Sequence, residues 1–441
     1  MKHLLLFITI ATLLSSKLSG QITQQQIEVF LNDTAIRSGH VGISIYEPAT
    51  NKYLYTHNAE KNFLPSSNVK LFSMYAGMKY LGDSLVGAKI SERNDTVFFQ
   101  PTGDPTFLHK DFSYQPFYDK LKNSKGKLGH VLTFKDRYSK YGSGWSWNDY
   151  EDDYMAERSR FPIYGNVFTF YKENNVIECI PSIIRPPYFA DSLEKYFSNT
   201  KYFKISRVQD FNKFFITSNN EVFKFQQIPF KTHSDIYTWG LQIKLITEKL
   251  EISKNIINEY FIDNFKWRKI YSQPTDSLLR PMMHNSDNFF AEQTLLMVSN
   301  EVLGYMSDEE IIDTLLKTDL KGLPQKPRWV DGSGLSRYNL FSPNDFIFLL
   351  QKMQAEFGMQ RIKNILPTAG QGTLRGYYEN ATGKIYAKTG SMSNNVSLSG
   401  YITTKKNKAL LFSVHINGFS GTGRAGRKAI EKMILEIIEN N

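Results

Sequence analysis

Short segments in which apolar and polar residues alternate fill the middle of the chain, from about residue 88 to residue 230. Such alternation is typical of half-buried β-strands, and turn-forming residues separate the segments at 172–175 and 218–220. This block constrains the fold, because the segments on either side must be joined across it. The strands that we expect in it are 95–100, 131–134, 167–171, 176–180, 202–205, 213–217 and 222–226.

The two flanks of this block carry complementary patterns. Residues 41–46 and 52–56 predict a β-hairpin near the start, and three strands followed by a helix are predicted at the end. We therefore expect residues 21–87 and 231–441 to build one α/β domain, with residues 88–230 inserted as a β-rich region. The late strands are expected at 384–389, 396–403 and 409–416, and the helices at 24–32, 67–82, 236–250, 289–302, 308–314, 344–357 and 423–439.

The first 20 residues have the features of a secretory signal peptide. A basic start, with Lys2 and His3, precedes apolar residues 4–14, which are too few to span a bilayer, and small residues follow up to Gly20. We expect cleavage near Gly20 and export across the inner membrane to the periplasm. An uncleaved anchor is the alternative. The rest of the sequence contains no stretch long and apolar enough for a transmembrane helix.

Charge and cysteine content narrow the possible partners and chemistry. The formal charge of +10 suits an anionic polymer such as a cell wall, or a membrane surface. Nucleic acid is a weaker alternative, because the lysines are scattered and no zinc-ligand spacing accompanies them. Cys179 is the single cysteine, so no internal disulfide forms. Its alternating surroundings predict a buried hydrophobic residue rather than a catalyst.

The sequence Ser67-Asn68-Val69-Lys70 begins an apolar run that predicts a helix. Residues three apart lie on one face of a helix, so the Lys70 amine would reach the Ser67 hydroxyl. An acyl-transfer nucleophile needs this arrangement, with a base beside the hydroxyl and backbone N–H donors beside the carbonyl that it attacks. The same spacing occurs elsewhere in the chain, but only Ser67 opens a long apolar helix.

Two further motifs lie far along the chain. Ser286-Asp287-Asn288 stands immediately before a predicted helix, and a Lys-Thr-Gly sequence at 388–390 ends a predicted strand. The Ser-x-Asn spacing recurs elsewhere, whereas Lys-Thr-Gly occurs once. Ser-x-x-Lys, Ser-x-Asn and Lys-Thr-Gly in this order are the signature of penicillin-recognising serine acyl-enzymes, in which the three motifs meet at one cleft.

On these motifs the chain resembles the D-alanyl-D-alanine carboxypeptidase/endopeptidase family of penicillin-binding proteins, the class C low-molecular-mass type. The Gly-Asp-Pro turn at 102–105 and the stretches 331–336 and 372–375 match further stretches of that family. The resemblance is strongest from about Met282 onward and weakest in the inserted block. It implies a β-lactamase/transpeptidase-like domain, which is an antiparallel sheet flanked by helices, with an inserted β-rich region.

The resemblance and the chemistry of the side chains imply a role for each motif residue. Ser67 would attack the carbonyl between two D-alanines, and a neutral Lys70, its pKa lowered by a cation such as Lys388, would take the hydroxyl proton. Ser286 would relay a proton to the leaving amine. Substrate would be bound by Asn288, Lys388, Thr389, Gly390 and Ser391.

Backbone N–H groups of Ser67 and Ser391 would form the oxyanion hole, and Gly390 would let the substrate lie against the strand edge. The resemblance implies neither a metal nor a cofactor.

Simpler interpretations exist for several residues. The alternative for Ser67 and Ser286 is a helix N-cap alone. Asp104 is expected to be a turn residue rather than a catalyst, and Asp287 to be solvated or favoured by the helix dipole. Structural or supporting roles are expected for Glu292, His284 and Arg375.

We therefore expect a serine-type D-alanyl-D-alanine carboxypeptidase that acts on peptidoglycan stem peptides and binds β-lactam antibiotics covalently. Endopeptidase cleavage of cross-links is a second activity, which the sequence does not rank against the first. Two alternatives are a β-lactamase-like hydrolase, although no extra glutamate motif is evident, and a non-catalytic cell-wall-binding homologue, although all three motifs are intact. The sequence leaves open the diamino-acid preference, the oligomeric state, the rate of β-lactam deacylation and the role of the inserted region.

Overall fold

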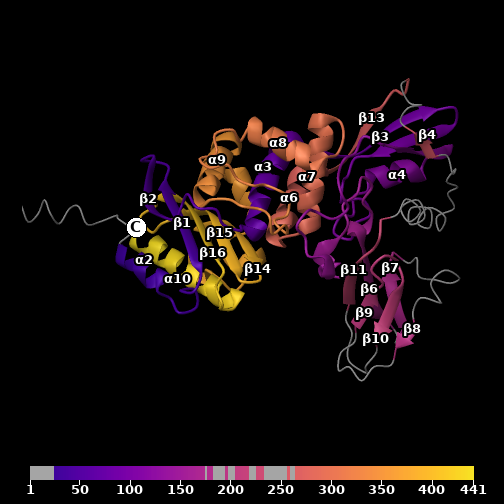
Figure 1. Ribbon diagram of the computed structural model, residues 1–441. Coiled ribbons are helices and arrows are strands. Elements are labelled where there is room, and N and C mark those ends of the chain that lie inside the picture. Colours follow the sequence, from indigo (N-terminus) through magenta and orange to yellow (C-terminus); the bar gives the residue numbers. More distant parts are fainter. Residues whose placement is uncertain are drawn as a thin grey trace, which may run out of the picture.

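A helix-covered β-sheet occupies one end of the molecule, and three further sheets lie at the other end (Figure 1). The computed structural model describes residues 24–173, 176–181, 194–196, 204–217, 225–232, 256–258 and 264–441. The signal peptide expected at 1–20 and the helix expected at 236–250 lie outside these residues.

The first sheet is built by both ends of the chain. Its strand order is β14-β15-β16-β1-β2, with antiparallel neighbours throughout. The early hairpin of β1 and β2 joins the late strands because β1 pairs with β16. The strands are β1 (His40–Glu47), β2 (Lys52–His57), β14 (Ile385–Met392), β15 (Asn395–Thr403) and β16 (Ala409–Asn417).

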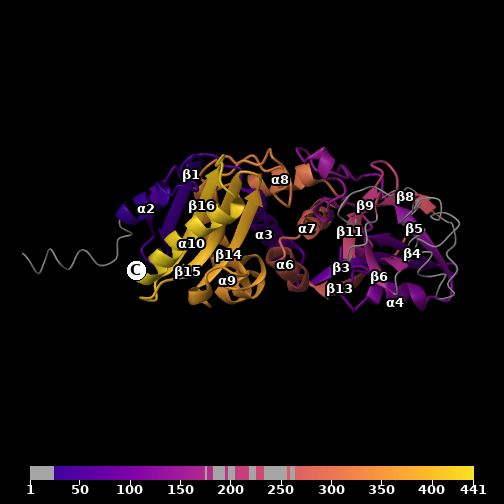
Figure 2. The same cartoon turned by 90° about the horizontal axis from the view of Figure 1, so that it is seen from below.

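Helices cover both faces of this sheet. The terminal helices α2 (Gln24–Leu31) and α10 (Gly423–Asn440) pack on one face, as Figure 2 shows from below. On the other face α9 (Pro343–Ile365) lies against β16 and β1. Ile434 of α10 and Phe412 of β16 are both fully buried in the core that the terminal helices cover. The fold therefore brings the two chain ends into one hydrophobic core.

The helix α3 (Lys70–Tyr80) is the centre of the helical layer. Its residues from Lys70 to Met78 are all buried, as expected for a helix that is apolar on every side. One 3-10 turn, η1 (Ser66–Val69), leads directly into it. Around it lie α6 (Thr275–His284), α7 (Asn288–Leu303) and α9, and α8 (Asp308–Lys317) packs on α7.

A second five-stranded sheet begins the β-rich part of the molecule. Its order is β12-β5-β4-β3-β13, in which β5 is parallel to both of its neighbours. The helix α4 (Pro116–Lys122) contacts β13, whose chain runs on directly into α6. The strands are β3 (Ser84–Arg93), β4 (Thr96–Pro101), β5 (Lys127–Leu132), β12 (Ile256–Asn258) and β13 (Arg268–Pro274).

Two three-stranded sheets, β11-β6-β7 and β8-β10-β9, complete this part. Phe168, Phe170 and Phe214 are fully buried where these sheets meet, and their rings contact one another. The strands are β6 (Val167–Glu173), β7 (Val176–Ile180), β8 (Glu194–Tyr196), β9 (Lys204–Arg207), β10 (Phe214–Thr217) and β11 (Phe225–Pro229). The remaining short 3-10 turns are η2 (Trp147–Asp149), η3 (Asp153–Met155), η4 (Tyr164–Asn166), η6 (Gly372–Leu374) and η7 (Glu379–Ala381).

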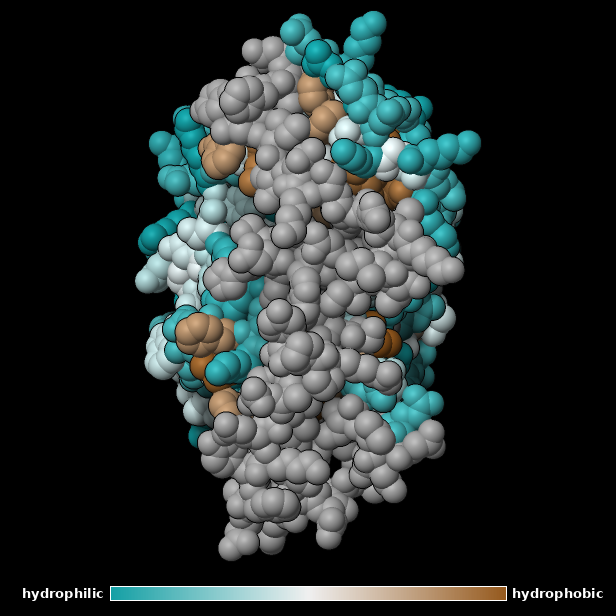
Figure 3. Space-filling view, turned by 90° about the vertical axis from the view of Figure 1, so that its right-hand side faces the viewer, coloured by the Kyte–Doolittle hydropathy of each residue, from teal (hydrophilic) through white to brown (hydrophobic). Residues whose placement is uncertain are grey.

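The outer face of the β-rich part is shown in Figure 3. Where described residues are visible at its two edges, most are hydrophilic, and the hydrophobic ones lie in small groups. Among the described helices, none combines the length and the apolar character needed to cross a membrane.

The structure confirms the expected α/β architecture with an antiparallel sheet, flanking helices and a β-rich region between the two parts of that sheet. Most expected elements are present with ends shifted by a few residues; β5, for example, spans 127–132 rather than 131–134. The helix expected from Ser67 begins at Lys70, because the chain enters it through η1. The domain boundaries expected at 87/88 and 230/231 remain predictions. The strand β13, which follows the second of these boundaries, pairs with β3 and so belongs to the second sheet.

Six of the described helices and strands were not expected from the sequence, namely α4, β3, β8, β12, β13 and α6. The strand β3 is apolar on both faces over much of its length, so it lacks the alternation that marks a half-buried strand. The helix α6 contains Pro281, which usually signals a break. Tertiary packing around α3 overrides that local signal.

Candidate active site

Ser67 lies in the turn η1, which is held against the first sheet. The backbone of Ser66 is left-handed (φ 50°) and directs the chain into this turn. The carbonyl of Pro65 accepts a hydrogen bond from Ser397 Oγ of β15 at 2.7 Å, and Asn68 Nδ2 donates to the same Oγ at 2.7 Å. The position of Ser67 is therefore set by contacts with a strand far away in the sequence.

The amine of Lys70 is fully buried and donates three hydrogen bonds. Its Nζ lies 2.9 Å from Ser67 Oγ, 2.7 Å from Asn288 Oδ1 and 2.7 Å from the carbonyl oxygen of Ser333. Burial lowers the pKa of Lys70 to about 8, and the nearby carboxylates of Asp331, Asp287 and Glu292 oppose this effect. The main cause is thus burial rather than the charge of Lys388, although the direction agrees with the sequence-based expectation.

Neither candidate serine is a helix N-cap. Pro65 precedes η1 and Val69 precedes α3, and neither position is capped by a side chain. The helix α7 is capped by Asp287, whose carboxylate accepts a hydrogen bond from the N–H of Phe290 at 2.8 Å. Asp287 therefore has the helix-end role that was one of its two expected roles, and Ser286 is free for another.

The Ser-x-Asn motif faces the nucleophile from the start of α7. Ser286 has a left-handed backbone (φ 57°), and its Oγ accepts a hydrogen bond from Lys388 Nζ at 2.9 Å. Asn288 accepts from Lys70 and donates to the carbonyl of Tyr154 at 3.2 Å. The motif thus contacts both lysines of the site.

The Lys-Thr-Gly motif lies on β14, the edge strand of the first sheet. Lys388 is fully buried, and its Nζ also donates to the carbonyl of Thr389 at 2.7 Å. Burial and the charge of Lys70 lower the pKa of Lys388 well below its ordinary value. Thr389 is 8% exposed, whereas Ser391 at the open end of the strand is exposed.

The structure gives Gly390 a role within the fold, beside the expected role toward the substrate, which stays a prediction. A Cβ atom at this position would lie 2.2 Å from Ser397 Oγ and 2.6 Å from the carbonyl oxygen of Pro65. The sequence-based expectation was that glycine admits the substrate. In the structure, glycine admits the turn that carries Ser67, because any side chain would push that turn away from β14.

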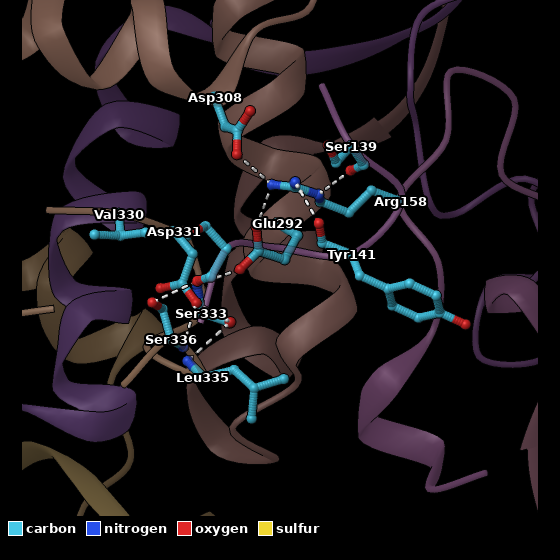
Figure 4. Close-up of polar contacts among 12 residues, drawn as sticks. Ser139, Tyr141, Arg158, Glu292, Asp308, Val330, Asp331, Ser333, Leu335 and Ser336 are labelled. Carbon is cyan, nitrogen blue, oxygen red and sulfur yellow. Dashed lines mark hydrogen bonds and ion pairs between the residues drawn. The ribbon is translucent and has the colours of Figure 1, made fainter. Parts of the chain in front are cut away.

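The loop at 331–336, drawn in Figure 4, supports Lys70, whose Nζ donates to the carbonyl of Ser333. Asp331 Oδ1 accepts from the N–H of Gly334 at 2.9 Å, and Oδ2 accepts from the N–H of Ser336 at 2.6 Å. Gly334 is left-handed (φ 81°), and a Cβ there would lie 1.9 Å from the carbonyl oxygen of Ser66. The loop therefore touches both the turn of the nucleophile and the amine of Lys70.

The hydrogen bond from Lys70 Nζ to the carbonyl of Ser333 was not predicted from the sequence. The stretch 331–336 was noted only as a family match, and a contact made by a backbone carbonyl leaves no signal in residue type. Glu292, for which a supporting role was expected, accepts a hydrogen bond from the N–H of Ser333 at 2.8 Å. That expectation agrees with the structure.

A cavity of about 280 Å³ opens beside the Ser-x-Asn motif. Ser286 and Asn288 form one wall, and the opposite wall comes from the β-rich part of the molecule. Most of the side chains there are polar or charged, among them His109, Lys110 and Asp153, and Val167 is apolar. The site therefore has room for a polar substrate chain next to the candidate catalytic residues.

The residues for which no catalytic role was expected lie in structural or exposed positions. Cys179 is buried in the apolar core of the β-rich part, and burial raises the pKa of its thiol. Asp104 is a buried turn residue that accepts hydrogen bonds from the backbone N–H and the hydroxyl of Thr106. His284 ends α6, where its carbonyl lies 2.7 Å from the place of a Cβ at Gly372. Arg375 is exposed after η6.

Comparison with protein families finds a match over most of the chain. The model of the D-Ala-D-Ala carboxypeptidase 3 (S13) family matches residues 23–189 and 253–440. A D-alanyl-D-alanine carboxypeptidase of Actinomadura sp. (strain R39) is 24% identical over 90% of this chain and 81% of its own length. The resemblance inferred from the motifs is confirmed by these matches.

Solved structures share the fold. Penicillin-binding protein 4 (dacB) of Haemophilus influenzae superimposes with a TM-score of 0.73 at 20% identity, covering 93% of this chain and 98% of that one. The same protein complexed with a β-lactam gives a TM-score of 0.71 at 19% identity, covering 95% and 100%. A predatory peptidoglycan endopeptidase of Bdellovibrio bacteriovorus gives a TM-score of 0.52 at 13% identity, covering 91% and 92%. The expected β-lactamase/transpeptidase-like fold with an inserted region is confirmed.

Proposed function

The chain belongs to the D-Ala-D-Ala carboxypeptidase 3 (S13) family, and we propose that it is a serine-type carboxypeptidase that removes the terminal D-alanine from peptidoglycan stem peptides. The observation that carries this proposal is the 2.9 Å contact between Lys70 Nζ and Ser67 Oγ. It pairs a hydroxyl with a buried amine whose pKa is lowered, as nucleophilic catalysis requires.

Acylation follows from this geometry. Neutral Lys70 takes the proton of Ser67 Oγ as that oxygen forms a bond to the carbonyl carbon between the two D-alanines. The tetrahedral oxyanion is stabilised by backbone N–H groups of Ser67 and Ser391. Its collapse breaks the peptide bond, and the proton that Lys70 took is passed through Ser286 to the leaving amine, so Lys70 is neutral again. Lys388 holds Ser286 in place, because its Nζ donates to Ser286 Oγ. The products are free D-alanine and a Ser67 ester.

Deacylation reverses the proton transfers. Water attacks the ester carbonyl and gives a proton to the amine of Lys70. As the second tetrahedral intermediate collapses and its bond to Ser67 Oγ breaks, Lys70 returns this proton to Ser67 Oγ. The shortened peptide is then released. Asn288 holds Lys70 in place through both steps, because its Oδ1 accepts from Nζ at 2.7 Å.

Substrate recognition rests on the edge of the first sheet. Among the described strands β14 pairs with β15, and Thr368 bridges its other edge at Tyr386. Beyond that bridge, from Lys388 to the end of β14, no described strand pairs with this edge, which leaves it for an extended peptide. Lys388 and Thr389 lie at this edge and supply an amine and a hydroxyl for the terminal carboxylate. A β-lactam carries a carboxylate next to a strained amide, so Lys388 and Thr389 would bind its carboxylate in the same way. Attack of Ser67 on the strained amide would then give a stable penicilloyl adduct.

The proposal is tested with purified muropeptides and a fluorescent penicillin. Loss of the terminal D-alanine from pentapeptides and covalent labelling by penicillin are both expected, and both should vanish in Ser67→Ala. D-Alanine release that survives this substitution would contradict the proposal. A folded wild-type protein that is not labelled would favour the non-catalytic alternative, and rapid hydrolysis of penicillin would favour the β-lactamase alternative.

Endopeptidase cleavage uses the same chemistry on a larger leaving group. The cavity of about 280 Å³ beside Ser286 gives room for a peptide beyond the scissile bond. We propose this as a second activity, and incubation with purified cross-linked dimers tests it by the appearance of monomers. Retention of the dimers during turnover of pentapeptides would limit the protein to carboxypeptidase activity.

We also propose that the protein works in the periplasm, where its substrate lies. This rests on the composition of residues 1–20. Mass spectrometry of the mature protein from its source should show an N-terminus near Gln21. Recovery of the full chain from the cytoplasm would contradict this location.

A further inference from the structure

A buried cluster of charged side chains lies outside the proposed catalytic residues (Figure 4). Arg158, from the β-rich part, contacts Glu292 of α7 and Asp308 at the start of α8. The side chains of Arg158 and Glu292 are each only 1% exposed. Arg158 Nη1 lies 3.3 Å from Glu292 Oε2 and 2.5 Å from Asp308 Oδ2. The cluster joins the two parts of the molecule.

The remaining donors of Arg158 are used within its own segment. Its Nε donates to the carbonyl of Ser139 at 2.9 Å, and its Nη2 donates to the carbonyl of Tyr141 at 3.4 Å. The guanidinium is therefore held from both sides. It presents Nη1 to the two carboxylates in a fixed orientation.

Glu292 transmits this orientation to the active site. While Oε2 faces Arg158, Oε1 accepts a hydrogen bond from the N–H of Ser333 at 2.8 Å. The backbone carbonyl of Ser333 in turn accepts a hydrogen bond from Lys70 Nζ at 2.7 Å. One residue of backbone thus separates the ion pair from the proposed base. A shift of Glu292 would move the carbonyl that directs the Lys70 amine toward Ser67.

Further hydrogen bonds link the segment that carries Arg158, residues 139–158, directly to the 331–336 loop. Trp145 Nε1 donates to Asp331 Oδ2 at 2.9 Å, and Ser336 Oγ donates to the carbonyl of Ser143 at 2.6 Å. The guanidinium of Arg158 also lies over the ring of Trp145, 5.7 Å from its centroid. Residues 139–158 therefore hold the 331–336 loop at several points along its length.

Stabilisation of the fold alone is a poor explanation for this cluster. A buried ion pair contributes little net stability compared with apolar residues of similar size, because both charges lose their hydration. What such a pair provides is a fixed geometry, and here the fixed element is the loop beneath Lys70. The function of the cluster should therefore be sought in that loop.

We propose that Arg158 is a positioning residue for Lys70, acting through Glu292 and the backbone of Ser333, so that the β-rich part of the molecule is required for acyl transfer. This rests on the proposed function, because Lys70 matters in this way only as the base for Ser67. It assigns to the region predicted as an insertion a role in catalysis in addition to any role in binding.

The test measures acylation of the full-length protein by a fluorescent penicillin at saturating concentrations. Arg158→Gln should lower the limiting acylation rate by about 10- to 100-fold and leave the apparent dissociation constant of penicillin within about twofold. Arg158→Lys, which keeps the charge, should recover part of the rate. In a Glu292→Ala background, Arg158→Gln should have little further effect, because both changes break the same connection.

Arg160 provides a matched control. It lies two residues further along the same segment, forms an ion pair with Asp136 and also reaches α7, where its Nη1 contacts Asn300 Oδ1 at 3.2 Å. Arg160→Gln should destabilise the protein without changing the acylation rate by more than about twofold. Equal rates for Arg158→Gln and Arg160→Gln would overturn the inference.

Glu292→Gln gives an independent measurement if Arg158→Gln does not fold. It breaks the ion pair with Arg158 and keeps a side chain of the same size beside Ser333. The limiting acylation rate, measured at a pH where Lys70 is neutral, should therefore fall by at least about tenfold. A wild-type limiting rate in folded Glu292→Gln would overturn the inference.

Failure of the inference is distinguishable from failure of the proposed function. Wild-type protein that is labelled on Ser67, together with an unaffected Arg158→Gln variant, refutes only the inference. Wild-type protein that is folded but not labelled refutes the proposed function and, with it, the inference that rests on it.

Discussion

The Nζ of Lys388 lies 2.9 Å from the Oγ of Ser286, although 102 positions separate the two residues in the chain. A second pair, Lys70 and Ser67, has the same separation between amine and hydroxyl. Both amines are fully buried. Two ammonium groups in one dry cleft would repel each other, so the site favours states in which at least one amine is neutral and can act as a base.

The two serines should differ in their mutant kinetics. Ser67→Ala removes the atom that is acylated, so penicillin labelling should disappear and carboxypeptidase activity should fall by at least about 10⁴-fold. Ser286→Ala removes a proton relay and leaves the nucleophile, so labelling should persist with a rate lower by about 10²–10⁴-fold. Stopped-flow acylation and intact-protein mass spectrometry measure both effects. A penicillin adduct on Ser67→Ala would refute the assignment of the nucleophile.

Acylation should depend on pH in the direction set by Lys70. The amine takes a proton only when it is neutral, and burial lowers its pKa to about 8. Below that pH the limiting acylation rate should rise about tenfold per pH unit, and above it the rate should level off. The measurement is the rate with a β-lactam that itself has no ionisation in this range. A flat profile from about pH 6 to about pH 9 would exclude Lys70 as the titrating base.

Lys388 should discriminate between substrates by the charge at their C-terminus. The wild-type protein is expected to cleave a peptide ending in D-Ala-D-Ala faster than the same peptide with a C-terminal amide. In Lys388→Gln, kcat/KM for the free acid should fall by about 10- to 100-fold, since a charge-assisted hydrogen bond is lost. For the peptide with a C-terminal amide, kcat/KM should fall much less. An equal loss for both peptides would mean that Lys388 acts on the chemistry rather than on the carboxylate.

The three motifs were sufficient to predict which side chains meet in the site. In the structure, hydrogen bonds join Ser67, Lys70 and Asn288 in one set and Ser286 and Lys388 in a second set. This was possible because each motif consists of side chains whose chemistry is readable from residue type. Their spacing also fixes which of them share a helix turn or a strand.

The support beneath these side chains was not predictable in the same way. Ser333 contacts Lys70 through its backbone carbonyl, which every residue type possesses. Arg158 and Glu292 are separated by 134 positions, and an ion pair at that distance leaves no local pattern in the sequence. Glycine at position 390 was part of the motif, but its contact with a neighbouring turn, which only the folded chain brings close, left no signal in the sequence.

Gly334 offers a final test of the contact between the 331–336 loop and the turn of the nucleophile. Both Gly334 (φ 81°) and Gly304 (φ 83°), which ends α7, have left-handed backbones. A Cβ at Gly304 would meet nothing within 4 Å, whereas a Cβ at Gly334 would lie 1.9 Å from the carbonyl oxygen of Ser66. The two positions therefore share a backbone cost and differ in the collision.

Alanine at either position should cost about 1–2 kcal/mol of unfolding free energy for the left-handed backbone alone. Gly304→Ala should lose no more unfolding free energy than this, and it should be acylated at the wild-type rate. Gly334→Ala should lose more stability, and acylation should slow by at least about tenfold, because Ser66 moves and carries Ser67 away from Lys70. Thermal unfolding and penicillin acylation of both variants measure these effects. Wild-type acylation by a destabilised Gly334→Ala variant would show that the loop supports the fold without positioning the nucleophile.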